Sequence, residues 1–106
     1  MSCVACHVTN TLETRRIQHR GLRRLFSDDD GSRLTVEWVP RLRRQLAQLD
    51  AAGAPGDMDI IGWGFHALRG NRRGQYALRV SGNWRLVFRW DDDGPCDVDL
   101  EDYHGR

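Results

Sequence analysis

Lysine is absent from this sequence. All 16 basic side chains among its 106 residues are arginine, and 15 acidic residues leave a net charge of +1. Two explanations fit this usage. Arginine presents a planar fork of donors that suits phosphate and carboxylate groups, and a coding bias in a GC-rich genome would have the same result.

Other absences narrow the class of protein. No run of about 18 apolar residues occurs, which argues against an ordinary transmembrane helix. Residues 1–12 lack the basic start and apolar stretch of a signal peptide. The three cysteines cannot all pair, and none need do so in a reducing compartment. We therefore expect a cytoplasmic protein without a membrane partner, and its length fits one domain.

Charge is strongly segregated along the chain. Residues 60–90 contain six arginines and no acid, whereas residues 91–106 contain seven acids and one arginine. Such segregation can place a basic face on a nearly neutral protein, which is the electrostatic pattern expected for a polyanionic partner. The alternative is that the acidic tail pairs with the basic block inside one sheet.

Apolar residues at helical spacing predict two helices. The first covers residues 19–27. The second begins either at a Thr35 cap or near Pro40, which has no N–H to donate inside a helix, and it ends by Gly53. Its apolar face is formed by four residues that recur at intervals of three and four: Val39, Leu42, Leu46 and Leu49.

The remaining pattern predicts an α+β fold. Residues 14–18 are expected to form a short strand before the helices. From residue 63 the period changes to two, which indicates a meander of four half-buried antiparallel strands. We expect one domain over residues 13–106, preceded by a flexible extension over residues 1–12.

Strand register follows from the apolar residues, because a slip of one residue would turn them to the polar face. Val80 opposite Trp84 places Arg79 opposite Arg85 on that polar face. Like charges directly opposite each other are destabilising. The pair therefore needs an anion, either a phosphate or a neighbouring carboxylate in a cluster that serves stability alone.

The last two strands are expected to pair with Trp90 opposite Cys96, so that Cys96 faces the core. A three-residue loop ending in Gly94 fits this pairing. The same register sets two further pairs, Arg89 opposite Asp97 and Arg85 opposite Glu101.

Cys3-Val4-Ala5-Cys6-His7 matches the C-x-x-C-H pattern of covalent haem attachment. That chemistry needs an exported chain, and a zinc site would need further ligands. We therefore expect neither a metal nor a cofactor.

Two histidines are candidates for proton transfer. His66 lies on the predicted polar face, and His104 follows the last strand, which neighbours the strand of Arg85. Histidine exchanges protons near neutral pH, whereas arginine stays protonated and can stabilise a phosphorane dianion. The combination suits RNA cleavage without a metal, in which a base removes the 2′-hydroxyl proton and an acid protonates the leaving oxygen.

Several stretches resemble HigB-type toxins of the RelE/ParE superfamily, in the right order over residues 14–104. The Glu101-Asp102-Tyr103-His104 end is the most distinctive of them. The other similar stretches are Ile17-Gln18-His19-Arg20-Gly21-Leu22-Arg23-Arg24-Leu25-Phe26, Arg41-Leu42-Arg43-Arg44-Gln45-Leu46, His66-Ala67-Leu68-Arg69-Gly70 and Ser81-Gly82-Asn83-Trp84-Arg85-Leu86-Val87-Phe88.

The resemblance implies the toxin of a type II toxin–antitoxin system, which cuts translated mRNA on the ribosome and is neutralised by a helix-turn-helix, HigA-like antitoxin in a hetero-oligomer. The catalytic positions it implies are His66, Arg69, Arg85, Asp102, Tyr103 and His104. The basic block adds four expected RNA-binding residues: Arg72, Arg73, Arg79 and Arg89. The alternatives are a ParE-like inhibitor of DNA gyrase and an inactive co-repressor that only binds antitoxin.

Overall fold

Both expected helices are present in the structure, a computed structural model that describes residues 12–102. α1 comprises Arg20–Asp28 and α2 comprises Val39–Ala51. Their buried leucines are Leu22, Leu25, Leu42, Leu46 and Leu49. The predictions made for residues 1–11, the C-x-x-C-H pattern among them, and for residues 103–106 lie outside this described part.

α1 begins with a cap formed by a histidine. The Nδ1 atom of His19 accepts hydrogen bonds from the backbone N–H groups of Gly21 and Leu22, at 3.1 and 3.3 Å. A helix leaves its first N–H groups without an internal partner, so this ring nitrogen has a structural task. His19 therefore has a structural role at the start of α1.

The sequence left two possible starts for the second helix, a Thr35 cap or a start near Pro40, and the structure contains elements of both. Val36–Trp38 form a short 3-10 helix after Thr35, whose side chain makes no capping hydrogen bond. α2 proper begins at Val39, and Pro40 lies in its first turn. Proline is tolerated there because the first N–H groups of a helix have no partner to lose.

Four antiparallel strands follow, as expected, in the spatial order β1-β2-β3-β4. They comprise His66–Ala67 (β1), Gln75–Ser81 (β2), Trp84–Asp91 (β3) and Gly94–Asp102 (β4). The expected strand over residues 14–18 is wrong: Thr14–Arg16 form a 3-10 helix. Only Ile17 pairs with the sheet, through one parallel bridge to Val98, so the α+β class is right but its first strand is missing.

The predicted β2–β3 register is correct at the arginine pair and wrong next to the turn. Arg79 pairs with Arg85 as predicted, but Trp84 pairs with Ser81 rather than Val80. The loop therefore has two residues instead of three, and a β-bulge between Arg79 and Ser81 absorbs the extra residue.

The β3–β4 hairpin likewise combines a two-residue loop with a register irregularity farther along the strands. Asp91 pairs with Gly94 across a two-residue loop, so Trp90 faces Pro95 and Arg89 faces Cys96, one residue away from the prediction. A second irregularity lies at Asp97, whose φ of 49° is the left-handed conformation that aspartate adopts more readily than most residues. Beyond it the predicted pairing of Arg85 with Glu101 is restored.

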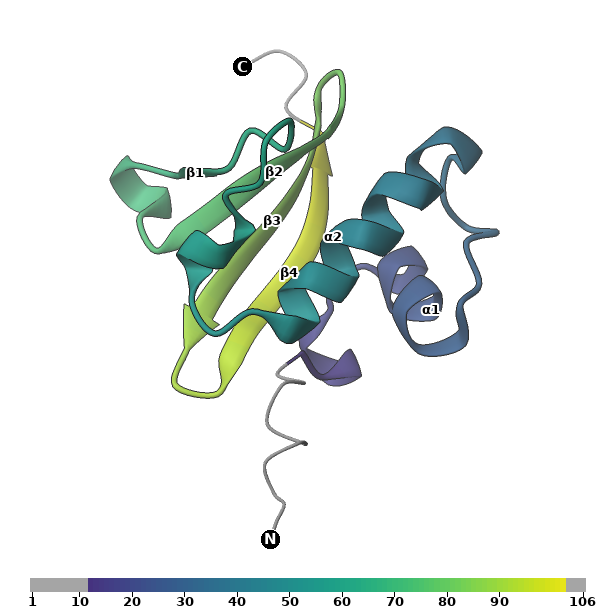
Figure 1. Ribbon diagram of the computed structural model, residues 1–106, viewed down its shortest axis with the longest axis horizontal. Helices are drawn as coiled ribbons and strands as arrows, with labels where there is room; N and C mark the ends of the chain where they lie inside the picture. Colours follow the sequence, from purple (N-terminus) through teal and green to yellow (C-terminus); the bar gives the residue numbers. More distant parts are fainter. Residues whose placement is uncertain (1–11, 103–106) are drawn as a thin grey trace, which may run out of the picture.

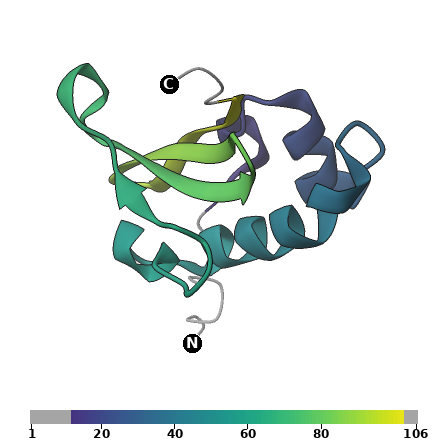
Figure 2. The ribbon, with the colours of Figure 1, turned by 90° about the horizontal axis from the view of Figure 1, so that it is seen from above.

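α2 covers the apolar face of the sheet, and α1 contributes to the same core. Figure 1 shows α2 in front of the strands with α1 beyond it, and Figure 2 shows α2 along one face of the sheet and α1 beside the sheet. The buried residues of this layer include Leu78, Leu86, Phe88 and Val98, each 0% exposed. Leu12 also belongs to this core. The opposite face is therefore the one available for polar chemistry.

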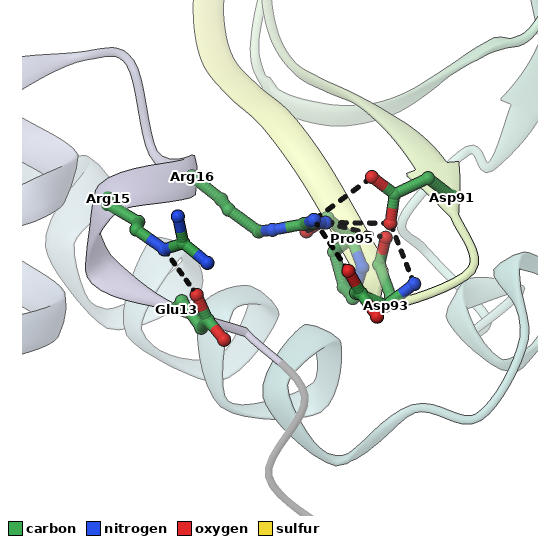
Figure 3. Close-up of polar contacts among 7 residues, drawn as sticks. Glu13, Arg15, Arg16, Asp91, Asp93 and Pro95 are labelled. Atoms are coloured by element: carbon green, nitrogen blue, oxygen red, sulfur yellow. Dashed lines mark hydrogen bonds and ion pairs between the residues drawn. The ribbon is translucent and has the colours of Figure 1, made fainter.

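Arg16 fastens the β3–β4 hairpin to the start of the domain (Figure 3). Its guanidinium donates to both carboxylate oxygens of Asp91, at 2.8 and 3.0 Å, and to the carbonyl of Pro95 at 3.2 Å. The hydrogen bond from Arg16, followed by one from the backbone N–H of Asp93, holds the pKa of Asp91 below its ordinary value. The two-pronged geometry favours the ionised carboxylate.

Because the pKa of Asp91 is lower in the folded than in the unfolded protein, its contribution to stability is present above the ordinary aspartate pKa of about 3.9 and is lost as pH falls through the lowered value. We expect Asp91→Asn to lower the free energy of unfolding at pH 7, and the deficit to shrink in acid. Urea denaturation from pH 7 to pH 3 measures it.

Asp92→Asn is the matched control, since this neighbouring carboxylate makes no hydrogen bond or ion pair within residues 12–102. A deficit for Asp91→Asn that stays constant with pH, or that Asp92→Asn reproduces, would contradict the role given to Arg16.

Candidate functional site

The face of the sheet that points away from the helices carries two cross-strand rows of side chains. The first row runs from β1 to β4 and comprises His66, Ala77, Val87 and Asp99. The second row comprises Arg79, Arg85 and Glu101. Paired residues project from the same face of a sheet, so one histidine and two arginines from three strands share this surface, which we call the open face.

His66 is held by the loop that precedes it. Its Nδ1 lies 3.0 Å from the carbonyl oxygen of Gly64. A carbonyl can only accept a hydrogen bond, so Nδ1 carries the proton and Nε2 has the lone pair when the ring is neutral. The side chain is exposed. This arrangement leaves Nε2 suited to accept a proton from a hydroxyl group.

Arg79 is fixed through its backbone rather than its guanidinium. Its N–H donates to the carbonyl of Trp63 at 2.6 Å, and its carbonyl, at the bulge, accepts from Nε2 of Gln45 at 3.0 Å. Its side chain is exposed and has no ion pair or hydrogen bond within the described residues. The guanidinium is thus presented on a rigid strand and is open to an anion.

Arg85 is oriented by the β2–β3 turn. Its Nη1 donates to the carbonyls of Gly82 at 2.7 Å and Trp84 at 3.1 Å. The side chain is half-buried, unlike that of Arg79. The cross-strand pair therefore combines one anchored and one mobile guanidinium, and their like charges favour an anion between them.

Arg72 reaches the open face from the β1–β2 loop. It lies in the 3-10 helix Gly70–Arg72, and its guanidinium donates to Oε1 of Gln75 and to Oε2 of Glu101, both at 2.7 Å. Glu101, which lies opposite Arg85 in the strand register, is therefore bonded to another arginine of the open face.

Two further expected RNA-binding residues, Arg73 and Arg89, and the expected catalytic residue Arg69 lie outside the two rows. Arg89 lies 3.8 Å from a carboxylate oxygen of Asp97, a loose ion pair. Arg73 is exposed in the loop, and Arg69 is exposed where that loop leaves β1. Neither has an ion pair within residues 12–102. All three extend the basic surface beyond the two rows.

Asp102 does not join His66 on the open face. It pairs with Trp84 at the end of β4, and alternation along the strand places it on the side opposite Glu101. Tyr103 and His104 lie outside the described residues, so the predicted cluster is described only in part. Within it, the structure brings together His66, Arg79, Arg85, Arg72 and Glu101.

Three supporting residues were missed by sequence reasoning. Gln45 is 0% exposed and lies on the apolar stripe of α2, three residues after Leu42; a polar residue on a buried stripe indicates a buried hydrogen bond. His19 and Gln75 gave no comparable pattern, because a cap and a loop contact depend on the final geometry.

Cys96 is half-buried beside Arg16 and Asp91 and does not belong to the core. The expectation that it faces the core is wrong because the two-residue loop shifts the register by one. Burial raises the pKa of its thiol, and the carboxylates of Asp91 and Asp97 raise it further. A protonated thiol is a poor nucleophile.

Within residues 12–102, no three His, Cys, Asp or Glu side chains gather where they could hold a metal ion. No helix in that part of the chain is long and apolar enough to span a bilayer.

A four-stranded antiparallel sheet with a helix-packed core on one face, and with histidine and arginine on the other, defines a small α+β protein with a basic open face. Residues 15–104 match the family described as RelE-like toxin of type II toxin–antitoxin system HigB. The chain belongs to this family of HigB-like toxins. Membership implies an antitoxin partner.

Two relatives are consistent with this family assignment. The chain is 30% identical over 87 residues to "Endoribonuclease HigB" of Proteus vulgaris, which covers 82% of this chain and 95% of the relative. It is 38% identical over 73 residues to "Toxin HigB-1" of Vibrio cholerae serotype O1, which covers 67% of this chain and 77% of that toxin.

The Arg79–Arg85 pair gives a stability test of the open face. We expect Arg79→Gln to raise the free energy of unfolding at low salt, by up to about 1 kcal/mol, because it removes a like charge directly opposite Arg85. The gain should vanish in phosphate, which would bind the paired guanidiniums of the parent. Urea denaturation in low-salt chloride and in phosphate measures both effects.

Arg33→Gln is the control, since it removes an exposed arginine far from the sheet. If Arg79→Gln destabilises the protein at low salt, or if phosphate stabilises both variants and the parent equally, the two guanidiniums do not form an anion site.

Proposed function

We propose that this toxin is an endoribonuclease that cuts mRNA on the ribosome and thereby inhibits translation and arrests growth. One observation carries the proposal: His66 presents Nε2 on the same face as the Arg79–Arg85 pair. Phosphodiester cleavage through the 2′-hydroxyl requires a group that accepts the hydroxyl proton and cations that stabilise the charge on the phosphate. His66 and the two arginines are groups of these kinds. The name of the Proteus vulgaris relative states the same activity for that protein.

The reaction assigns a task to each group. A base, His66 or His104, removes the 2′-hydroxyl proton, and the 2′ oxygen attacks the neighbouring phosphorus. The bond from phosphorus to the 5′ oxygen breaks, an acid returns a proton to that oxygen, and a 2′,3′-cyclic phosphate remains. Arg85 holds the charge that develops on the phosphate, since a guanidinium stays protonated throughout. This route uses no metal ion or cofactor.

The remaining expected residues are assigned to binding and orientation. Arg73, Arg79 and Arg89 would contact phosphates along the strand, and Arg69 would approach the scissile one from the end of β1. Tyr103 would stack on a base, as aromatic side chains do with unpaired RNA, and Asp102 would orient a neighbouring group. Such a protein acts in the cytoplasm, where ribosomes translate.

The antitoxin is proposed to be a HigA-like helix-turn-helix protein that docks on the helix side. The helix side carries four arginines, Arg23, Arg24, Arg43 and Arg44, whose positive charge is already partly neutralised. Arg24 is paired with Asp30, and Arg43 is paired with Asp29. The Arg43–Asp29 pair lines a pocket whose apolar lining includes Leu25, Phe26 and Leu46. An amphipathic segment therefore fits this side better than a purely acidic one.

The catalytic assignment is tested with His66→Ala. We expect cleavage of mRNA on programmed ribosomes to fall by about 100-fold or more, the usual loss when a general base is removed, while ribosome binding stays unchanged. His19→Asn is the matched control, because asparagine keeps a side-chain acceptor at the start of α1. Cleavage by His66→Ala at the parental rate would overturn the role of His66.

The same assay tests the chemical route. A message with a 2′-deoxynucleotide at the scissile position should remain intact, because the attacking oxygen is missing. Cutting of that message by the parent would show that a water or another nucleophile attacks instead.

A further inference from the structure

The bond between Arg72 and Glu101 joins two distant parts of the chain across the open face. Each side chain is only 31% exposed. The other ion pair on this face, Arg89 with Asp97, is longer, at 3.8 Å, and its side chains are 41% and 51% exposed. Partial burial reduces the screening of an ion pair by water. Arg72 and Glu101 therefore form the stronger cross-face link.

The link runs diagonally over three strands. Gln75 is on β2 and Glu101 on β4, and the guanidinium of Arg72 bonds to both. Register places Val87 of β3 between them, on the same face and one row from each. Val87 is 0% exposed although it points away from the helices. The Arg72 guanidinium thus spans the position of the buried Val87.

The two ends of this link lie next to the proposed catalytic segments. Arg72 lies in the β1–β2 loop, which follows His66 of β1 and contains Arg69. Glu101 directly precedes Asp102, Tyr103 and His104 in the chain. We propose that Arg72 and Glu101 are positioning residues: their ion pair clamps the β1–β2 loop to β4 and so fixes the two catalytic segments relative to each other. This inference rests on the proposed function.

A different role for the same pair gives opposite predictions. Glu101 would then occupy the place of an RNA phosphate, and RNA would displace it from Arg72. Removing the carboxylate would tighten RNA binding and leave the catalytic rate unchanged. The bond to Gln75 and the position of Arg72 over the buried Val87 favour the clamp. A guanidinium whose role is to bind phosphate needs neither a second protein partner nor a buried apolar residue beneath it.

Glu101→Gln separates the two roles. Loss of the clamp should lower kcat for mRNA cleavage on programmed ribosomes by about tenfold or more, because small misplacements of reacting groups are costly, and should leave KM within about twofold. Arg72→Lys, which keeps a charge for Glu101, should retain more activity than Arg72→Gln. The control is Asp97→Asn, which changes the net charge by the same amount and suits the left-handed backbone there; its kcat should match the parent.

Three results would overturn the clamp. These are an unchanged kcat with a lowered KM for Glu101→Gln, equal activity losses for Arg72→Lys and Arg72→Gln, and an equal loss of kcat for Asp97→Asn.

Hydrogen–deuterium exchange of the free protein distinguishes failure of the clamp from failure of the proposed function. Glu101→Gln should speed amide exchange in residues 68–74, and Asp97→Asn should not. If the parent cuts no RNA but the loop is released as expected, the proposed function fails while the physical link stands. If the parent cuts RNA and the loop exchanges at the parental rate in Glu101→Gln, the clamp fails alone.

Discussion

The pairing of β2, β3 and β4 is the constraint on which the molecule depends. It turns Leu78, Leu86 and Phe88 toward the helices and Arg79 and Arg85 away from them. A slip of one residue would exchange the two sets and destroy the core and the open face together. Two bulges accommodate the tight turns without allowing that slip. The core thereby fixes the position of the guanidiniums that the proposed chemistry uses.

Electrostatics on the open face is compensated locally. Arg79 and Arg85 face each other, an arrangement that costs stability, and Glu101 lies next in the same row. Yet Glu101 bonds to Arg72. The other carboxylates here are Asp97, which is loosely paired with Arg89, and Asp99 in the first row, so guanidinium groups outnumber carboxylates. A surplus of positive charge remains there, and a phosphate backbone is its natural partner. The low net charge of the whole chain hides this surplus because acidic residues are concentrated in β4 and the β3–β4 turn.

The sequence predicted what depends on periodicity and missed what depends on local geometry. Alternation from residue 63 onward predicted the meander, and the apolar sets predicted Arg79 opposite Arg85 and Arg85 opposite Glu101. The turn pairings of Trp84 and Trp90 were wrong, because a two-residue loop with a bulge and a three-residue loop give the same pairing farther along the strands. Residues 14–18 were misassigned because five residues carry too little pattern to separate a strand from a 3-10 turn.

The site was predictable to a similar extent. The shared face of His66, Arg79 and Arg85 was predictable because alternate residues of a strand project from the same face. The hydrogen bond of Gln45 to the bulge and the reach of Arg72 across β3 were not found, since both depend on how a long side chain crosses to another element. Asp102, a catalytic position implied by the resemblance, pairs with Trp84, and strand alternation places it on the face opposite Glu101. The hydrogen bonds that position the site side chains therefore come from residues outside the periodic pattern.

The central claim, that the open face binds RNA, can be tested by nuclear magnetic resonance of the arginine side chains, which comprise every basic residue of this chain. A single-stranded RNA with 2′-O-methyl riboses cannot be cut through the 2′-hydroxyl. On its addition, we predict shifts of the Nε–Hε signals of Arg79 and Arg85, with those of Arg23 and Arg43 on the helix side unchanged. Shifts confined to the helix-side arginines would contradict the account.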